Sequence, residues 1–305
     1  MRNCMHYVTD HAKTALRISA VLTVLAASLL LTSCQDAFVY HPSTAEEEEL
    51  LEEASRKGME PWPEAGADRI GWYAPPVGSG AGAGDGNRTA GTAEPAGPGS
   101  GPPHRVIVFH GNGGQSVRRD HFVEGFQSPN TLGTWEVYIL EYPGFGSRPG
   151  DPSEEVLVSA AADGVERLLA EDSSRPVYIV GESLGTGVAS QVAAAYPEAV
   201  PAILLITPFT SIVDVGAARF PGFLVRAILE DRYDNEAALS RYDGRVGFLL
   251  AGEDSVVPTE LGRRLYKGYD GPKRLWIQES AGHNNLDYSP QSPWWRELTA
   301  FLLGR

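Results

Sequence analysis

Residues 181–185, Gly-Glu-Ser-Leu-Gly, place a serine between two glycines. The apolar run 177–180 precedes this pentad, and small, helix-tolerant residues follow it from Thr186 to Ala195. The order is that of a strand, a sharp turn and a helix, with the serine at the turn. The glycines allow a tight backbone turn that a Cβ would block, so that the serine hydroxyl points outward. This pattern predicts that Ser183 is a nucleophile for acyl transfer.

A serine nucleophile needs a base that takes its proton and a carboxylate that orients the base. In sites built on a strand–turn–helix serine, the acid and then the histidine follow the serine along the chain. His283, the only histidine after Ser183, follows the apolar run 275–278, and Asp254 follows the run 246–251 in the same way. We therefore predict a triad of Ser183, Asp254 and His283. The competing carboxylates, which have less suitable positions, are Glu253, Asp214, Asp243 and Asp287.

The tetrahedral intermediate of acyl transfer requires hydrogen-bond donors for its oxyanion. We expect the backbone N–H groups of Leu184 and Asn112 to be these donors. Asn112 lies in the segment 110–114, His-Gly-Asn-Gly-Gly, where small residues let the backbone approach a substrate. This segment is not a phosphate-binding loop, because no Gly-Lys-Ser/Thr follows, and it lacks the dinucleotide-binding spacing G-x-G-x-x-G. We interpret His110 as structural.

Short apolar runs alternate with helical stretches from Arg105 onward. Continuous apolar runs are typical of strands buried on both faces of a parallel sheet, and their alternation with helices indicates helices on both faces. The expected strands are 70–74, 106–109, 137–140, 177–180, 202–206, 246–251 and 275–278. The expected helices are 118–127, 153–171, 184–196, 258–268 and 294–303. The predicted fold is therefore α/β, a doubly wound and mostly parallel sheet with its chemistry at the strand C-termini.

Residues 105–303 resemble the α/β-hydrolase superfamily, in particular the branch of serine aminopeptidase-like hydrolases and depalmitoylase-like α/β-hydrolase-domain proteins. The segments that carry the resemblance are HGNGG at 110–114, YPGFGS at 142–147, PSE at 152–154, GESLGTG at 181–187, TPFTSI at 207–212, GED at 252–254 with VP at 257–258, and GHN at 282–284. The resemblance implies an α/β-hydrolase fold, and the branch includes esterases and thioesterases. Two features depart from the pattern: Glu182 stands where many relatives carry Arg or His, and the insertion 78–103 is unusual.

A small helical cap is expected at 208–245, which allows medium or long acyl chains. Tyr142, Phe145 and Phe209 are candidates to line an acyl pocket, although such aromatic side chains are also typical of plain core. We therefore expect a serine hydrolase that cleaves carboxylic ester or thioester bonds of a small-molecule or acylated substrate, with no cofactor.

Two other readings stay open. One is a serine peptidase of the aminopeptidase-like branch, in which Glu182 or Glu141 would receive the substrate amine. The other is a lipoprotein that keeps the fold and binds a partner without catalysis. The complete set of triad residues argues against the second reading, because a scaffold does not need it.

The N-terminus predicts a bacterial lipoprotein signal peptide at 1–33. Basic residues precede the apolar run 18–31, and Leu-Thr-Ser-Cys at 31–34 is similar to a lipobox, which implies lipidation of Cys34. An ordinary signal peptide or an anchor helix is the alternative. Gln35 after the cysteine indicates the outer membrane, if the cell has one. The expected address is therefore the cell envelope, through a lipid anchor in the membrane.

Composition sets the remaining expectations. The net charge of −14 argues against nucleic-acid binding, and the two cysteines, Cys4 and Cys34, leave no disulfide in the mature chain. No Cys/His cluster indicates a metal site. Residues 34–66 are expected to form an anchor segment with a solvated acidic helix capped by Ser43 or Thr44, and 67–305 the hydrolase domain. Within that domain, 78–103 has the composition of a disordered loop.

Overall fold

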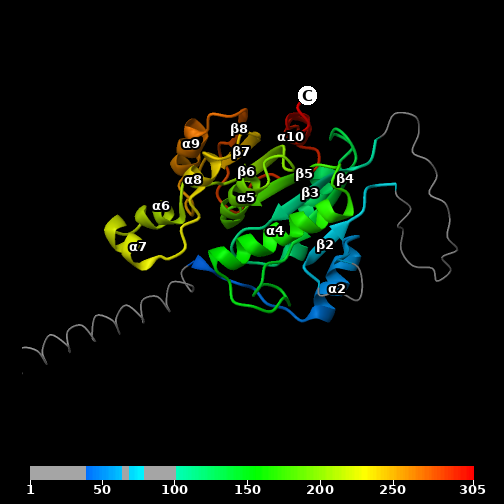
Figure 1. Cartoon of the computed structure of the whole chain (residues 1–305), viewed down its shortest axis with the longest axis horizontal. Coiled ribbons are helices and arrows are strands. Elements are labelled where there is room, and N and C mark those ends of the chain that lie inside the picture. The colour runs from blue at the N-terminus through cyan, green and yellow to red at the C-terminus, as the bar shows by residue number, and fades with distance from the viewer. Residues whose placement is uncertain (1–38, 64–68, 79–100) are drawn as a thin grey trace, which may run out of the picture.

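One eight-stranded sheet runs through the computed structural model, which describes residues 39–63, 69–78 and 101–305 (Figure 1). Its strands lie in the order β1-β2-β4-β3-β5-β6-β7-β8. In chain order the strands are β1 (Glu60–Trp62), β2 (Gly71–Ala74), β3 (His104–Phe109), β4 (Trp135–Leu140), β5 (Val177–Glu182), β6 (Ala202–Ile206), β7 (Arg245–Ala251) and β8 (Lys273–Gln278). The pairs β1–β2 and β2–β4 are antiparallel, and every pair from β4 to β8 is parallel. The mostly parallel α/β sheet that the sequence predicts is confirmed.

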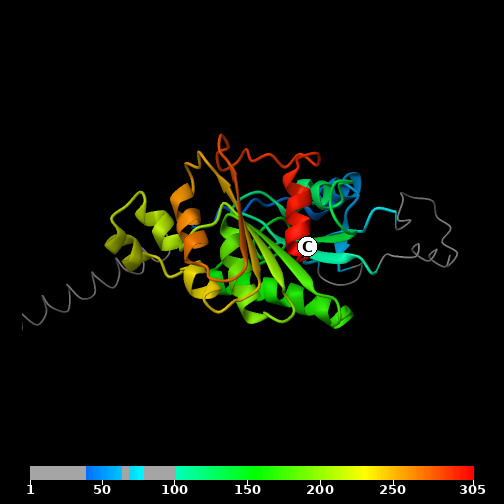
Figure 2. The ribbon, with the colours of Figure 1, turned by 90° about the horizontal axis from the view of Figure 1, so that it is seen from above.

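Helices cover both faces of this sheet (Figures 1 and 2). On one face the core contains residues of α4 (Glu154–Glu171), α5 (Leu184–Ala195), α8 (Asn235–Leu239) and α9 (Thr259–Gly268). On the other face it contains residues of α2 (Glu47–Arg56), α3 (Asp120–Phe126) and α10 (Trp294–Leu302). The central strands are buried on both sides, which is why their sequences are apolar runs without alternation.

Helix α4 begins with a side-chain cap, and helix α2 does not. The Ser153 side chain accepts a hydrogen bond from the Val156 N–H at 3.2 Å, and Glu154 and Glu155 occupy the first turn of α4. Helix α2, by contrast, has Glu46 as its N-cap without a side-chain bond, so the expected Ser43 or Thr44 cap is wrong. Thr44 instead forms an isolated bridge with Gly146.

Helix α2 is also not solvated on all sides. Its Leu50 is fully buried and its Ala54 is 1% exposed, and both pack into the core that contains α3 and α10. The four glutamates 46–49 occupy the outer face of its first turn and the position before it. The helix is therefore amphipathic and part of the folded body.

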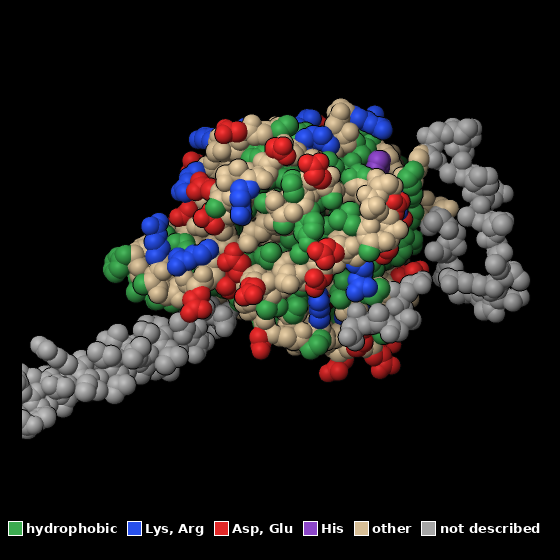
Figure 3. Space-filling model, in the orientation of Figure 1, with side chains coloured by type: hydrophobic (Ala, Val, Ile, Leu, Met, Phe, Trp, Pro, Cys, Tyr) green, Lys and Arg blue, Asp and Glu red, His purple; other side chains and the backbone are tan. Residues whose placement is uncertain are grey.

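Three short helices lie between β6 and β7, in the segment 208–245. They are α6 (Ile212–Ala217), α7 (Gly222–Ile228) and α8, and α6 and α7 project beyond the sheet at one end of the molecule (Figure 1). Phe220, Phe223 and Leu224 are exposed there, with fractions of 54%, 79% and 43%. Figure 3 shows this apolar tip with basic side chains next to it.

Several expectations fall outside the described residues. The signal peptide at 1–33 and Cys34 lie within 1–38, and most of the 78–103 loop lies within 79–100. Across the described ranges, none of the helices has both the length and the apolar character that a membrane span requires.

Candidate active site

Ser183 stands at the junction of β5 and α5 with φ 52° and ψ −116°. A positive φ is unusual for a residue with a Cβ, and here the Ser183 N–H donates to the Ile206 carbonyl at 2.9 Å, which fixes the turn to β6. A Cβ on Gly185 would lie 2.0 Å from the Phe109 carbonyl oxygen, and one on Gly181 would lie 2.4 Å from that of Gly185. Both glycines of the pentad are therefore required by close backbone approach.

Three side chains form a continuous hydrogen-bonded chain at the C-terminal end of the sheet. His283 Nε2 lies 2.9 Å from Ser183 Oγ, and His283 Nδ1 lies 2.7 Å from Asp254 Oδ2. The other Asp254 oxygen, Oδ1, accepts from the N–H groups of Val256 and Val257, each at 2.8 Å. The side chain of Asp254 is 2% exposed, so its carboxylate is held in one orientation. With the proton on Nδ1 directed at Asp254, Nε2 is free to accept the serine proton.

The competing carboxylates have other surroundings. Asp214 accepts from Thr210 Oγ1 at 2.6 Å and pairs with Arg264. The side chain of Glu253 is exposed to solvent. His283 therefore has Asp254 as its carboxylate partner.

The two expected oxyanion donors lie beside Ser183. Asn112 and Leu184 both line the cavity that contains Ser183. Within the described part of the chain, neither backbone N–H donates a hydrogen bond to another residue. The neighbouring Gly111 N–H, in contrast, donates to Glu182 Oε2 at 3.3 Å.

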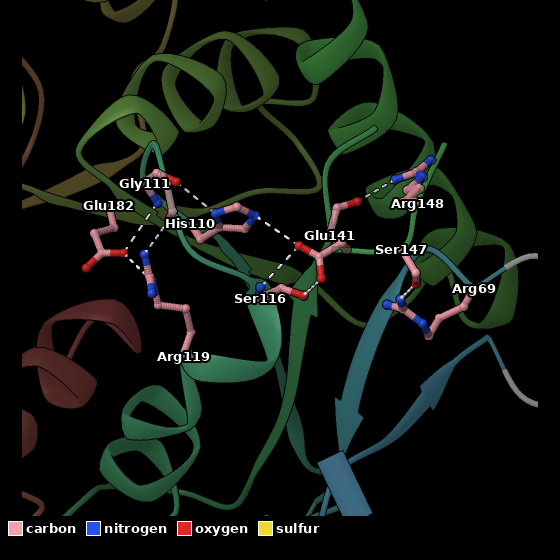
Figure 4. Close-up of polar contacts among 10 residues, drawn as sticks. Arg69, His110, Gly111, Ser116, Arg119, Glu141, Ser147, Arg148 and Glu182 are labelled. Atoms are coloured by element: carbon pink, nitrogen blue, oxygen red, sulfur yellow. Dashed lines mark hydrogen bonds and ion pairs between the residues drawn. The ribbon is translucent and has the colours of Figure 1, made fainter. Parts of the chain in front are cut away.

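Glu182 is joined to Arg119 by an ion pair that the sequence did not indicate (Figure 4). Arg119 Nε lies 2.7 Å from Glu182 Oε2, and Arg119 also donates to the Gly113 carbonyl at 3.2 Å. Burial by itself raises the pKa of the Glu182 carboxyl, but Arg119, His121 and the Gly111 N–H outweigh it and hold this pKa below its ordinary value. The residue before Ser183 therefore carries a charge that Arg119 neutralises.

A second carboxylate, Glu141, lies fully buried beneath the same loop (Figure 4). It accepts from the Ser116 hydroxyl at 2.7 Å and the Ser116 N–H at 3.1 Å, and His110 Nε2 lies 3.6 Å away. Burial raises the pKa of Glu141, but His110 and Ser116 outweigh this effect and lower it. His110 Nδ1 lies 2.8 Å from the Gly111 carbonyl, so His110 supports the loop from below.

Ser183 opens into a cavity of about 910 Å³. Most of its apolar lining residues come from α6, α7, the segments beside them and the loop after β7: Phe209, Ile212, Val215, Phe220, Leu224, Val225, Ile228, Leu229, Val256 and Val257. Its polar residues, apart from Ser183 and His283, include His41, Asn112, Arg119, His121, Glu182, Arg219 and Asn284. The cavity thus combines many apolar side chains with a smaller set of polar and charged ones.

Only one of the three expected pocket aromatics lines this cavity. Phe209 does, whereas Tyr142 and Phe145 are fully buried in the core and do not. Their rings pack against the ring of His110, with centroids 4.5 and 5.3 Å apart. The expectation was wrong for these two residues because they support the loop 110–114 from inside.

Sequence reasoning missed Arg119, His121, Val39 and His41 as cavity residues. None of them belongs to a motif with a fixed spacing from Ser183. Among the described residues, no cluster of histidine, cysteine, aspartate or glutamate side chains is arranged to hold a metal ion.

The fold and this site define a class of protein, and comparison with known families agrees. The family model for the alpha/beta hydrolase fold matches residues 104–298, and the chain belongs to this family. Among solved structures, Est1E from Butyrivibrio proteoclasticus with bound ferulic acid superposes with a TM-score of 0.55 at 19% identity. That match covers 66% of this chain and 90% of Est1E, and it shows the shared fold.

Two sequence relatives are more similar. An uncharacterised protein of Mycobacterium tuberculosis, Rv2307c, is 34% identical over 189 residues, which covers 61% of this chain and 64% of the relative. Lysophosphatidylserine lipase ABHD12 of Macaca fascicularis is 32% identical over 227 residues, which covers 65% of this chain and 56% of the relative. The chain thus spans less than two thirds of the length of each of these relatives. The family match and these relatives support a hydrolase, and the macaque relative is a lipase by name.

Proposed function

We propose that this protein is a serine hydrolase that cleaves carboxylic ester or thioester bonds. The observation that carries the proposal is the unbroken hydrogen-bonded chain from Asp254 through His283 to Ser183. In the first half-reaction Ser183 Oγ attacks the carbonyl carbon and its proton passes to His283 Nε2. The oxyanion receives hydrogen bonds from the Asn112 and Leu184 N–H groups.

The remaining steps of the reaction use the same groups. The tetrahedral intermediate collapses, His283 gives its proton to the departing alcohol or thiol, and an acyl ester remains on Ser183. A water molecule then attacks this ester while His283 takes a proton from the water. The carboxylic acid is released, and Ser183 Oγ takes the proton back from His283. The chemistry needs no group beyond side chains, backbone and water.

The cavity supports an acyl chain as the part of the substrate that is bound. The lining residues within α6 and α7 are apolar, and the volume of about 910 Å³ has room for a long aliphatic chain. Arg119, Glu182 and His121 also line the cavity, which suits a hydrophilic alcohol part. The lipase name of the macaque relative agrees with a substrate that has one acyl chain and a polar head.

The peptidase reading receives no comparable support. It requires a carboxylate free to bind the substrate amine, and Glu182 already pairs with Arg119 at 2.7 Å. Glu141 is fully buried and holds Ser116.

We also propose that lipidated Cys34 anchors the protein at a bacterial membrane. Val39, the first described residue, lines the same cavity as Phe220 and Leu224, which belong to the exposed apolar tip. An anchor five residues before Val39 would hold the cavity close to lipid substrates.

Ester turnover by the full chain in detergent tests the proposal. With a p-nitrophenyl ester of medium chain length, release of nitrophenol that depends on Ser183 is expected, with a burst close to one equivalent if the acyl-enzyme is hydrolysed more slowly than it forms. Ser183→Ala should show neither burst nor turnover. A wild-type protein that is folded and inactive on esters and thioesters of every chain length would contradict the proposal and favour a binding lipoprotein.

A further inference from the structure

The first described residues, Val39, Tyr40 and His41, lie inside the active-site region although they precede Ser183 by more than 140 positions. We call them the N-terminal brace. Val39 and Tyr40 are 6% and 3% exposed, and Val39 and His41 line the cavity. The brace therefore forms part of the cavity wall and is not a trailing end.

One side of the brace is bound to the loop that carries the proposed oxyanion donor. The His41 N–H donates to Asn112 Oδ1 at 2.7 Å, and Asn112 Nδ2 donates to the Val39 carbonyl. Both polar ends of the Asn112 side chain are thus occupied by the brace, while its backbone N–H remains available for a substrate.

The other side of the brace is bound to the segment that follows α7. Tyr40 donates from its hydroxyl to Asp231 Oδ2 at 2.5 Å, and its hydroxyl lies 2.9 Å from that of Tyr233. Burial raises the pKa of the Tyr40 hydroxyl far above its ordinary value, with Tyr233 and Asp231 adding to the effect, so Tyr40 stays a donor.

This attachment point is itself rigid. Asp231 Oδ1 accepts from the Glu154 N–H at 3.2 Å, and the Glu154 carboxylate accepts from the Tyr233 N–H at 2.9 Å. The Tyr233 ring is fully buried against Gly187 of α5, where an added Cβ would lie 2.5 Å from it. The brace is therefore tied to the starts of both α4 and α5.

The loop 110–114, by contrast, has little rigidity of its own. Asn112 is flanked by Gly111 and Gly113, and Gly113 and Gly114 have φ of 91° and 74°. Glycine restricts the backbone least, so the position of the Asn112 N–H depends on outside contacts.

We propose that the N-terminal brace is a positioning element for the reaction, and that Tyr40 and the Asn112 side chain hold the Asn112 N–H where the oxyanion forms. This inference rests on the proposed ester hydrolysis. It links the segment that leads to the proposed membrane anchor directly to the catalytic loop.

The test uses the full chain with Tyr40→Phe, Asn112→Ala and the double variant. Asn112→Ala keeps the backbone N–H and removes both contacts to the brace. Loss of a whole oxyanion donor costs about 100- to 1,000-fold in kcat, so a misplaced donor should cost at least about tenfold. KM for the ester should change much less, because the variants leave the apolar residues of α6 and α7, proposed to bind the acyl chain, in place. The double variant should lose no more kcat than Asn112→Ala alone, since both changes release the same brace.

Matched controls are Tyr196→Phe, whose hydroxyl bonds Glu166 on the surface, and Asn130→Ala on an exposed loop. Both should keep wild-type kcat, and thermal unfolding should show all variants folded at the assay temperature. A wild-type kcat in folded Asn112→Ala, or kcat losses that simply add in the double variant, would overturn the positioning role of the brace and leave the proposed hydrolase function standing. A wild-type protein without Ser183-dependent turnover would overturn the proposed function, and the brace with it.

Discussion

Arg119 Nε lies 2.7 Å from Oε2 of Glu182, the residue directly before the proposed nucleophile. Both side chains are 18% exposed, and the Gly111 N–H donates to the same carboxylate oxygen. This carboxylate therefore joins the turn at Ser183 to the loop 110–114.

Glu182→Gln tests this connection. The variant leaves the Arg119 guanidinium largely buried without its anion, which should lower the free energy of unfolding by about 1–3 kcal/mol. The expected kcat is lower as well, because the loop loses one of its attachments. Urea unfolding and ester turnover measure the two effects. Glu52→Gln, which removes an exposed pair with Arg56, is the control and should change neither.

The same pair predicts a pH dependence of stability. The pKa of the Glu182 carboxyl is lower in the folded protein than its ordinary value of 4.5, so its contribution to stability is present above pH 4.5 and is lost as the pH falls below it. The difference in unfolding free energy between wild type and Glu182→Gln should therefore shrink at low pH. A difference that stays constant from pH 7 down to pH 3 would show that Glu182 is not a stabilising carboxylate.

Asp254→Asn tests the proposed orienting acid. Loss of the carboxylate favours the wrong tautomer of His283, and kcat should fall by about 10⁴ while the fold is retained. Steady-state ester turnover with a circular dichroism spectrum measures both. Glu253→Gln changes the neighbouring, exposed carboxylate and should leave kcat at the wild-type level. Near-normal turnover of Asp254→Asn would mean that another group orients His283.

The length of the acyl chain should affect ester turnover, because α6 and α7 contribute many of the apolar residues that line the cavity. We expect kcat/KM for p-nitrophenyl esters to rise from acetyl toward medium or long chains. Val215→Trp narrows the cavity and should reduce kcat/KM for the longest chain at least about tenfold, with little effect on the acetyl ester. Val77→Trp, at a residue that is 74% exposed, is the control. Equal kcat/KM values for all acyl-chain lengths in the wild-type protein would contradict the proposal that α6 and α7 bind the acyl chain.

Cys34→Ala tests the proposed lipid anchor. Without the thiol no diacylglycerol can be attached, and the protein should leave the membrane fraction. Cys4→Ala, which lies within the proposed signal peptide, should leave the membrane association unchanged. Tight association of Cys34→Ala would instead indicate an uncleaved apolar anchor.

The parts of the fold that local signals determine were predictable from the sequence. The apolar runs of β3 to β8 and the helix start at Ser153 lie where they were expected, because each depends on residues close together in the chain. Strand β1 was missed, since it has three residues and contains Pro61, which is tolerated there on an edge strand. The individual bounds of helices α6 to α8 in the expected helical cap were not predicted, because each has only five to seven residues, too few for a helical period to show.

The site divides in the same way. The local sequence predicts the turn that contains Gly181, Ser183 and Gly185. The contact of His41 with Asn112, in contrast, joins residues 71 positions apart and leaves no local pattern. The aromatic side chains Tyr142 and Phe145 show why composition alone cannot separate pocket from core. Both lie next to the loop of Asn112, but on its inner side.

The most direct measurement of the central claim is labelling of the full chain with a fluorophosphonate, followed by mass spectrometry of its peptides. One adduct is expected, on Ser183, and none in Ser183→Ala or His283→Ala. Ser280→Ala, at an exposed serine near His283, should be labelled like wild type. A folded wild-type protein that remains unlabelled, or one that is labelled equally well after Ser183→Ala, would contradict the assignment of Ser183 as an activated nucleophile.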